Sequence, residues 1–517
     1  MAPARITPKK QNFPQWYQDV IANAPDLYDE SPVTGCITFG PLATKLWENI
    51  KNHFDRNIKA LGVENIMLPT LIPEHFFKRE KEHVEGFAPE VAVVTHAGGE
   101  KLTEPYFVRP TSELLFVDWF SRSGRVQSHR DLPVLANQWC SVLRWEKRPR
   151  AFLRTTEFHW QEGHCLFATE KHCREFTLKI LDLYAELAEE LLAIPVIKGE
   201  KPAHERFPGA LNTYTIEGMM QDGKALQMGT THVLSQDFLK GTDGKPMVQF
   251  LDENEKLTVP FYDSWGASTR LLGAVVMAHG DDEGIVLPPW LAPVQVAVLP
   301  IFGADEKEND KIREASRKLA SNLTSNQQPA TSNILTKVQG RLDWFEETSA
   351  PEGLTVRIDL RDCRLGEKTF HQIRSGTPIR IEVGTKELAE KVCVIKSRIR
   401  SRDTAEKVPF SKAKEAVMTM LKEDQAMLHA NAKKMFSEKT VEAKDYGELK
   451  EALAAGKWAL VPWDGTKEAV DKLKADTSGG TYRCFAFDSK EEAKGQKDPV
   501  SRKPSAFGKR IYVAKAY

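Results

Sequence analysis

The sequence predicts a mixed α/β (α+β) chain that is divided into three domains. Its 517 residues are roughly three times the length of an average domain. A proline-rich segment, PPWLAP at 288–293, precedes a region in which short apolar runs alternate with helical patterns. A charged helical stretch then begins near residue 405 and leads into a last unit. We therefore expect domains at residues 1–290, 291–404 and 405–517.

The first domain contains a predicted amphipathic helix at residues 41–61. Apolar residues recur there every three or four positions, Pro41 can occupy the first helical position, and Gly62 can end the helix. The apolar run that follows, NIMLPTLIP at 65–73, is interrupted by prolines, which is typical of an edge or interface strand.

Two strands and two further helices are predicted in the rest of this domain. Residues 134–146 and 153–160 have the pattern of strands and flank a basic loop. Thr169 is a suitable N-cap for a helix over about 170–193, and another helix follows the segment SWGAST at 264–269.

Strands alternate with helices in the second domain, which predicts a small three-layer α/β fold. The predicted strands are VQVAVLPIF (294–302), TVRIDL (355–360) and IRIEVG (379–384), and a charged helix extends to Leu323. In the last domain, the polar segment 491–505 is expected to be a mobile loop.

The composition limits the class of protein. The 72 basic and 72 acidic residues cancel, which neither favours nor excludes a nucleic-acid partner, because such binding depends on local patches. The seven cysteines form no C-x-x-C pair, so reduced thiols in the cytosol are expected. We find no pattern of a secretory signal or of a membrane span, and we expect a cytoplasmic protein.

Three arginines predict a binding site for a polyphosphate. Arg144 and Arg154 lie ten residues apart around the basic loop, and Arg270 lies at the start of the helix after SWGAST. A buried arginine requires a partner, and a helix N-terminus itself favours anions. If the three side chains face one cleft, they would bind phosphates through charge-assisted hydrogen bonds, although each could instead form a structural salt bridge.

These segments resemble the motifs of the class II aminoacyl-tRNA synthetases. GVENIMLP (62–69) resembles the end of the first motif, RWE (144–146) with FLRTTEF (152–158) the second, and WGASTRLLGAVVMAHGD (265–281) the third. Further segments are similar to the eukaryotic and archaeal type of prolyl-tRNA synthetase: FAPEVA (87–92), RPTSE (109–113), QSHRDLP (127–133), NQW (137–139), WQEGH (160–164) and MGTTH (228–232). Neither a P-loop nor a GxGxxG fingerprint is present.

The resemblance implies a fold, a reaction and a set of partners. The implied fold is a class II catalytic core built on an antiparallel sheet, followed by an anticodon-binding domain and a C-terminal domain. The implied activity is that of a proline–tRNA ligase, which activates L-proline with ATP to prolyl-adenylate and transfers it to the 3′ end of tRNA(Pro). The implied partners are ATP with Mg²⁺ near Gln227, L-proline, tRNA(Pro) and a second copy of the chain in a homodimer, with no membrane involved.

The resemblance also implies which residues bind each substrate. The proline-binding residues would hold the ammonium, enclose the ring and support those that do: Phe87, Thr111, Ser112, Glu113, Arg144, Trp160, Glu162, His164 and His232. The ATP-binding residues would stack on adenine and bind the phosphates or Mg²⁺: Arg144, Glu146, Arg154, Phe158, Gln227, Thr230, Ser268 and Arg270. Arg144 and Arg270 would be catalytic through charge stabilisation, and no general base is required because a carboxylate is already a nucleophile.

Several of these residues have a structural alternative. Thr111 and Ser112 could cap a helix that starts at Glu113, aromatic residues such as Phe158 are more often core residues, and His232 could be a structural histidine. For the chain as a whole, the alternatives are a threonine or glycine synthetase and a catalytically inactive tRNA-binding or regulatory module. The segments RPTSE and WQEGH argue against the first, and the three arginines argue against the second.

Two regions are expected to contact tRNA. The basic loop brings Lys147, Arg148 and Arg150 beside the predicted site, where they suit acceptor-stem phosphates unless the loop is simply solvated. The second domain resembles an anticodon-binding domain, but its segment GEKTFHQIRSG (366–376) departs from the usual GWKFNHWELKG. Lys368 and His371 are kept there and would contact the anticodon.

Two features of many relatives are missing from the sequence. Their last domain holds a Cys₄ zinc site, whereas the matching stretch at 463–474 has no cysteine and Cys484 is alone, so we predict no structural zinc. There is no room for a bacterial-type editing domain between Glu162 and Trp265, so misactivation of alanine or cysteine is expected. Tyr517 is expected to reach back towards the active site.

Overall fold

The large sheet that positions the predicted site contains eight strands, seven from the first domain and β25 from the last. The computed structural model describes residues 5–77, 91–122, 124–241, 243–324, 334–336, 345–349, 353–401 and 404–517. All neighbours in this sheet are antiparallel except β3 and β7, which confirms the predicted antiparallel core. Its strands, in spatial order, are β25 (Phe485–Ala486), β9 (Val196–Glu200), β10 (Ala210–Met219), β11 (Ala225–Leu234), β14 (Phe261–Ser268), β8 (Glu157–Phe167), β7 (Val134–Leu143) and β3 (Glu64–Asn65).

Helices of the first domain share one hydrophobic core with this sheet. Phe54 and Tyr184 stack in that core with ring centroids 4.7 Å apart. Trp265 lies over Gly163, where a Cβ would come within 2.1 Å of the indole, so a larger residue would displace the ring. The helices of this domain are α1 (Phe13–Asn23), α2 (Pro41–Ala60), α3 (Glu74–Phe77), α5 (Glu113–Ser121), α6 (Glu170–Glu186) and α7 (Arg270–His279).

The predicted helices are present with small differences at their ends. α2 begins at Pro41, and Gly62 follows it with a positive φ of 90°, a conformation that suits glycine. The hydroxyl of Thr169 accepts a hydrogen bond from the backbone N–H of His172 and so caps α6. A π-helical turn, Leu187–Leu191, follows α6 where the sequence predicted a continuous helix.

The proline-interrupted run at 65–73 forms two short strands instead of one. β3 ends at Asn65, and β4 (Leu71–Pro73) belongs to a separate three-stranded sheet with β6 (Glu100–Val108) and β5 (Val93–Ala97). Two-stranded ribbons are formed by β1 (Tyr28–Glu30) with β2 (Ile37–Phe39), and by β12 (Phe250–Leu251) with β13 (Leu257–Thr258). Met67, between β3 and β4, is 98% exposed.

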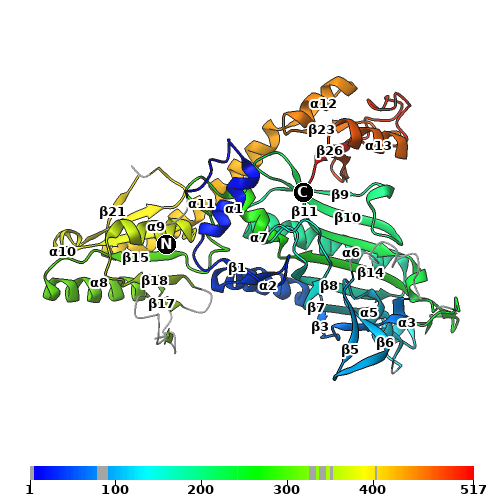
Figure 1. Ribbon diagram of the computed structural model, residues 1–517, viewed down its shortest axis with the longest axis horizontal. Coiled ribbons are helices and arrows are strands. Elements are labelled where there is room, and N and C mark those ends of the chain that lie inside the picture. Colours follow the sequence, from blue (N-terminus) through cyan, green and yellow to red (C-terminus); the bar gives the residue numbers. More distant parts are fainter. Residues whose placement is uncertain are drawn as a thin grey trace.

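The second domain is the expected α/β unit, in which strands β18, β15 and β19 are parallel. Its sheet has the order β16 (Ile334–Thr336), β17 (Phe345–Ser349), β18 (Thr355–Asp359), β15 (Val296–Pro300), β19 (Ile379–Val383), β20 (Val392–Ser397) and β21 (Glu406–Pro409). Its helices are α8 (Glu306–Thr324), α9 (Leu365–Arg374) and α10 (Thr385–Glu390). Figure 1 shows this domain at one end of the long axis and the eight-stranded sheet at the other.

A long helix, α11 (Ala413–Glu438), runs from the second domain towards the last one (Figure 1). Its first part, as far as Leu421, belongs to the hydrophobic core of the second domain, whereas Met435 and Phe436 pack with strand residues of the first and last domains. The last domain has a sheet of order β22 (Thr440–Glu442), β23 (Trp458–Val461), β26 (Ile511–Lys515) and β24 (Gly480–Tyr482), with helices α12 (Tyr446–Ala454) and α13 (Lys467–Asp476).

The segment 491–505 is anchored in the last domain, so the prediction of a mobile loop is wrong. Asp498 is fully buried, and its carboxylate accepts hydrogen bonds from the backbone N–H groups of Asp464 and Val500. Ala493 is also fully buried. The polar composition suggested solvation, but one buried carboxylate organises the turn around itself.

An ion pair joins the second domain to the end of α7. The guanidinium of Arg398 donates to both carboxylate oxygens of Asp281, each at 2.7 Å, and also to the carbonyl of Ile373 at 3.2 Å. Arg398 is only 6% exposed. The position of α7 is therefore tied to the second domain at one end and to the predicted site at the other. Among the described residues, none of the helices is apolar over the length that a membrane span needs.

Candidate active site

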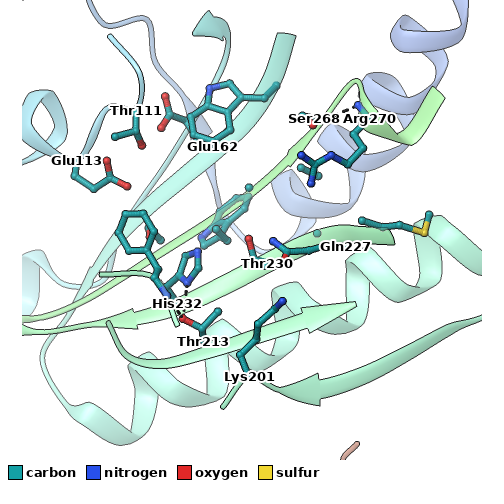
Figure 2. A pocket seen from close by; sticks show the side chains of 18 of the residues that line it. Thr111, Glu113, Glu162, Lys201, Thr213, Gln227, Thr230, His232, Ser268 and Arg270 are labelled. Atoms are coloured by element: carbon teal, nitrogen blue, oxygen red, sulfur yellow. Dashed lines mark hydrogen bonds between the residues drawn. The ribbon is translucent and has the colours of Figure 1, made fainter. Parts of the chain in front are cut away.

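One pocket on the eight-stranded sheet brings together twelve of the predicted site residues. Trp160, Glu162 and His164 face it from β8 because alternate side chains of a strand point to the same face. The twelve residues are Thr111, Glu113, Arg144, Phe158, Trp160, Glu162, His164, Gln227, Thr230, His232, Ser268 and Arg270. Figure 2 shows Thr111, Glu113 and Glu162 at one end, Ser268 and Arg270 at the other, and Gln227 and Thr230 between them.

Of the other residues predicted to bind proline or ATP, three lie beside the pocket, and one falls outside the residues that the structure describes. Arg154 and Glu146 line an adjoining hollow that shares Arg144 and Arg270 with the pocket. Ser112 is buried behind the pocket wall. The prediction for Phe87 falls outside the described residues.

The carboxylate of Glu162 is held by a dense set of hydrogen bonds. Its Oε1 accepts from the hydroxyl of Ser112 at 2.5 Å and from the amide of Gln138 at 2.6 Å, and its Oε2 lies 3.4 Å from Nε2 of His164. Nδ1 of that histidine lies 2.6 Å from the hydroxyl of Tyr262. Burial alone would raise the pKa of Glu162, but these partners lower it below its ordinary value. The pocket therefore contains a buried carboxylate that stays ionised at neutral pH and suits an ammonium group.

His232 lies on the opposite wall of the pocket and is neutral. Burial lowers its pKa to about 3, and the charges of His164 and Lys201 lower it further. Its Nδ1 lies 3.0 Å from the hydroxyl of Thr213, and its ring packs against Phe207 with centroids 4.9 Å apart. A neutral imidazole beside an aromatic ring provides a flat, largely apolar wall.

The three arginines form a concentration of positive charge. Arg144 donates through Nε to the carbonyl of Pro110 at 2.9 Å, and its guanidinium lies over the ring of Phe158 at 5.5 Å. Arg270 donates through Nε to the carbonyl of Leu153 at 3.1 Å. Burial and the charges of Arg154 and Arg144 lower the pKa of Arg270 to about 10, so it remains charged at neutral pH despite this repulsion. Such a cluster suits a polyanion.

Arg144 and Arg154 lie in the loop and not in the two predicted strands. β7 ends at Leu143 and β8 begins at Glu157, because Arg150 and Arg154 form a tight turn in which the backbone N–H of each donates to the carbonyl of the other. Arg154 also donates through Nη2 to the backbone carbonyl of Tyr517 at 3.2 Å. Tyr517 therefore reaches the rim of the site, as expected.

Five pocket residues lie outside every segment that the sequence pointed to as part of the site: Lys201, Glu205, Arg206, Phe207 and Thr213. Four of them lie in the charged segment KPAHERF (201–207), which connects β9 to β10. A run of alternating charges between two strands was the available signal, but such a run is more often a solvated connection.

Lys201 belongs to a buried ionic cluster that includes a residue of the last domain. Its ammonium lies 3.1 Å from Oε1 of Glu217, which is fully buried. Nη2 of Arg483 donates to both oxygens of the same carboxylate, each at 3.0 Å. Glu205 lies 3.7 Å from Lys201 and 3.8 Å from Arg483. We call these four residues the Glu217 cluster; it joins the last domain to the wall of the pocket.

The last domain does not offer the thiolates of a Cys₄ zinc site. Cys484 is buried next to β25, where its Sγ would lie 2.9 Å from a Cβ placed at Gly199 of the large sheet. In the part of the chain that the structure describes, no group of three or more His, Cys, Asp or Glu is placed to hold a metal. Asp464 and Thr466, in the stretch that matches the zinc-binding segment, instead bond to each other, with both hydroxyl–carboxylate distances at 2.9 Å.

We expect a strong chelator to leave the stability of the protein unchanged. A structural zinc contributes directly to folding free energy, so its removal would lower the melting temperature by many degrees. Thermal unfolding before and after exhaustive dialysis against a chelator checks this, together with elemental analysis. One zinc per chain, or a large loss of stability after dialysis, would contradict the prediction.

The residues predicted to contact tRNA divide into exposed and buried ones. Lys147, Arg148 and Arg150 are exposed beside the site. Lys368 is only 1% exposed, and its ammonium donates to the carbonyls of Pro300 and Asp359 at 2.8 and 3.0 Å. The structure therefore does not present Lys368 to an RNA, because its alkyl chain packs inside the second domain.

His371 also faces inwards. Its ring lies against Phe345 at 5.5 Å, in the crease between the second domain and the start of α2. Burial is the main reason that its pKa is lowered to about 4, and the charge of Arg361 contributes to the decrease. The kept residues Lys368 and His371 thus pack inside the second domain and at its boundary with the first.

Comparisons with known proteins match parts of all three domains to family models and most of the chain to curated relatives. Residues 96–279 match the family described as tRNA synthetase class II core domain (G, H, P, S and T), residues 295–420 match an anticodon binding domain, and residues 446–517 match the C-terminal domain of prolyl-tRNA synthetase. The chain is 39% identical to the proline–tRNA ligase of Phocaeicola vulgatus and 40% identical to that of Bacteroides fragilis, over 99% of each chain. The enzyme of Ruminiclostridium cellulolyticum is 40% identical over 99% of this chain and 98% of its own.

Proposed function

The chain belongs to the family of the proline–tRNA ligases, and from this premise we propose that its pocket activates L-proline with ATP and transfers it to tRNA(Pro). The observation that carries the proposal is that one pocket holds the ionised carboxylate of Glu162 and, at its other end, the half-buried cation of Arg270. An amino acid carries an ammonium and ATP carries a polyphosphate, so the two ends of the pocket have complementary charges.

Proline occupies the end of the pocket near Thr111, Glu113 and Glu162. Its ammonium is bound by the carboxylates, and its ring lies between Trp160 and the neutral His232. Ser112 does not touch the substrate in this proposal; it fixes the carboxylate of Glu162 from behind. Phe87 and His164 complete the set of proline-binding residues carried over from the family.

ATP occupies the arginine end, with its adenine against Phe158. Arg144 binds the carboxylate of proline and then the α-phosphate, while Arg154 and Arg270 bind the outer phosphates. Gln227, Thr230 and Ser268 offer oxygen atoms to the nucleotide or to Mg²⁺, for which oxygen ligands are appropriate. Bound Mg²⁺ would offset the charge of the phosphates.

The chemistry requires positioning and charge stabilisation from this chain, not proton removal. The carboxylate of proline attacks the α-phosphorus, and diphosphate leaves with its negative charge held at the arginine end. Fixed cations in a buried site stabilise the developing charge without reorganisation, which is commonly the largest catalytic contribution. The repulsion among Arg270, Arg154 and Arg144 is relieved when the phosphates bind.

The tRNA approaches the pocket past Lys147, Arg148, Arg150 and Glu146 and extends to the second domain, which binds the anticodon. We place the first domain boundary near 290, as expected, and move the second from 404/405 into α11, because β21 and the first part of α11 belong to the second domain. A homodimer forms through the segment from β3 to the start of β4, where Met67 and Leu71 are exposed. The protein works in the cytoplasm, consistent with seven free thiols.

Amino-acid-dependent ATP–pyrophosphate exchange, without tRNA, tests the activity. We expect strong exchange with proline and none with threonine, followed by proline attachment to tRNA(Pro) when that RNA is added. Folded protein that binds tRNA but catalyses no exchange with any amino acid would overturn the proposal.

The same assay is expected to reveal activation of alanine and cysteine. Both are small enough for the proline end of the pocket. The free energy by which a pocket discriminates against a substrate that lacks one methylene is only about 1–3 kcal/mol. The region between β8 and β14 contains α6, three strands of the large sheet and the two-stranded ribbon β12–β13, and no editing domain is formed by its described residues. A preference for proline over alanine above about 10⁴-fold would contradict this expectation.

A further inference from the structure

Thr213 is buried on β10 directly beside His232, and no role follows for it from the reaction alone. It is 2% exposed, and Figure 2 shows its hydrogen bond to the imidazole of His232 as a dashed line. Two contacts involve its hydroxyl oxygen. The backbone N–H of Phe207 donates to it at 3.1 Å, and Nδ1 of His232 lies 3.0 Å away.

The hydrogen-bonding capacity of this hydroxyl determines the direction of its bond to His232. A threonine hydroxyl has one hydrogen to donate, and one of its lone pairs is occupied by the N–H of Phe207. Within the described ranges, the acceptor in reach of that hydrogen is Nδ1 of His232. If Nδ1 carried a proton instead, the buried O–H of Thr213 would face a second donor and lose its bond, which is unfavourable.

The backbone holds this arrangement in place from two sides. The carbonyl of Thr213 accepts from the backbone N–H of Lys201 at 2.8 Å, and Thr213 pairs with His232 across β10 and β11. The ring of Phe207 packs on the imidazole and prevents it from turning away. A neutral imidazole carries one proton on one of its two nitrogens, so a hydrogen bond accepted at Nδ1 leaves the proton on Nε2.

We propose that Thr213 is a positioning residue that fixes His232 as the Nε2–H tautomer, so that the proline pocket receives an N–H donor from this wall. The substrate class that this donor recognises is the carboxyl or acyl oxygen of an amino acid or its adenylate. An N–H donor cannot accept from the ammonium of proline, which is therefore directed to Glu113 and Glu162. The proposal deepens the function proposed above and rests on it.

Three variants test the role in pyrophosphate exchange. Thr213→Val removes the hydroxyl at nearly constant volume, Thr213→Ser keeps it, and Thr231→Val makes the same change at a fully buried threonine of β11 whose hydroxyl has no partner among the described residues. We expect Thr213→Val to raise the KM for proline about tenfold, with the KM for ATP unchanged, as the loss of one oriented hydrogen bond would. Thr213→Ser and Thr231→Val should behave as the wild type.

The outcomes separate this inference from the proposed function. If the wild type fails to exchange with proline, the proposed function is wrong. If the wild type exchanges and Thr213→Val has an unchanged KM for proline, or Thr213→Ser is as impaired as Thr213→Val, the positioning role is wrong. If Thr213→Val raised the KM for proline and for ATP equally and lowered the melting temperature, Thr213 would be merely structural. That result would also overturn the positioning role.

A spectroscopic measurement does not depend on any Thr213 variant folding. Nitrogen NMR of the ¹⁵N-histidine-labelled protein distinguishes a protonated from an unprotonated ring nitrogen, and a His232→Asn variant assigns the signals. We expect His232 to show an unprotonated Nδ1 and a protonated Nε2 in the wild type and in Thr213→Ser. A proton on Nδ1 in the wild type would overturn the proposal.

Discussion

Arg270→Gln is expected to abolish most of the activity while leaving the protein as stable as before, or more so. Arg270 lies at the N-terminus of α7 inside the pocket. Replacing a fixed cation that stabilises transition-state charge commonly lowers kcat by about 10²–10³-fold, and we expect the upper end for kcat/KM in pyrophosphate exchange. Glutamine retains a donor for the carbonyl of Leu153 but not the charge.

The expected effect on stability has the opposite sign because Arg270 is held against like charges. Burial and the charges of Arg154 and Arg144 lower its pKa, which means that the folded state disfavours its charged form. Removing the charge should therefore preserve or raise the melting temperature. Arg122→Gln removes one partner of an exposed ion pair with Asp118 and is the matched control. It should change neither kcat/KM nor the melting temperature. A melting temperature that falls together with activity would contradict this account.

Arg483→Met is expected to have the largest effect on stability. The variant leaves the buried carboxylate of Glu217 with Lys201 alone, and breaking a buried ion pair typically costs about 3–5 kcal/mol. We expect a cost near the lower end, since Lys201 remains. Chemical denaturation measures it, and the double variant with Glu217→Gln should recover part of the loss because it removes the charge left behind.

The pH dependence of stability offers a second measure of the same cluster. Burial alone would raise the pKa of Glu217, but Arg483 and Lys201 lower it below its ordinary value. This contribution is therefore present above the unfolded pKa of a glutamate and is lost as pH falls through the folded pKa. In Arg483→Met the folded pKa of Glu217 lies closer to its unfolded value, so this loss should be smaller and complete at a higher pH. Arg510→Met, in a partly exposed pair with Glu442, is the control and should cost about 0–1 kcal/mol. Equal costs for the two arginines would contradict a special role for the cluster.

Local sequence patterns predicted the elements that depend on local interactions. The helix from Pro41 follows from its spacing of apolar residues, and the cap at Thr169 follows from the need of a helix N-terminus for an acceptor. The alternation in WQEGH brings Trp160, Glu162 and His164 to one face of β8. The family's motifs then directed attention to the residues that the fold assembles in one pocket.

The sequence could not predict features that depend on distant partners. Glu217 and Arg483 are 266 residues apart in the chain, and only the folded structure joins them. Lys368 looked like a basic surface residue because nothing in its local sequence reveals that two carbonyls enclose its ammonium. In the same way, Asp498 gave a polar segment the composition of a loose loop, although its buried carboxylate holds the segment in place.

The short strand β25 has a consequence for how the protein behaves in pieces. It pairs with β9 and so covers what would otherwise be the open edge of the large sheet. An uncovered edge strand presents unsatisfied N–H and C=O groups that recruit strands from other molecules and lead to aggregation. A fragment ending at the first domain would expose β9 in this way. The last domain therefore acts as a cover that keeps the catalytic sheet soluble, independently of any part it has in binding substrates.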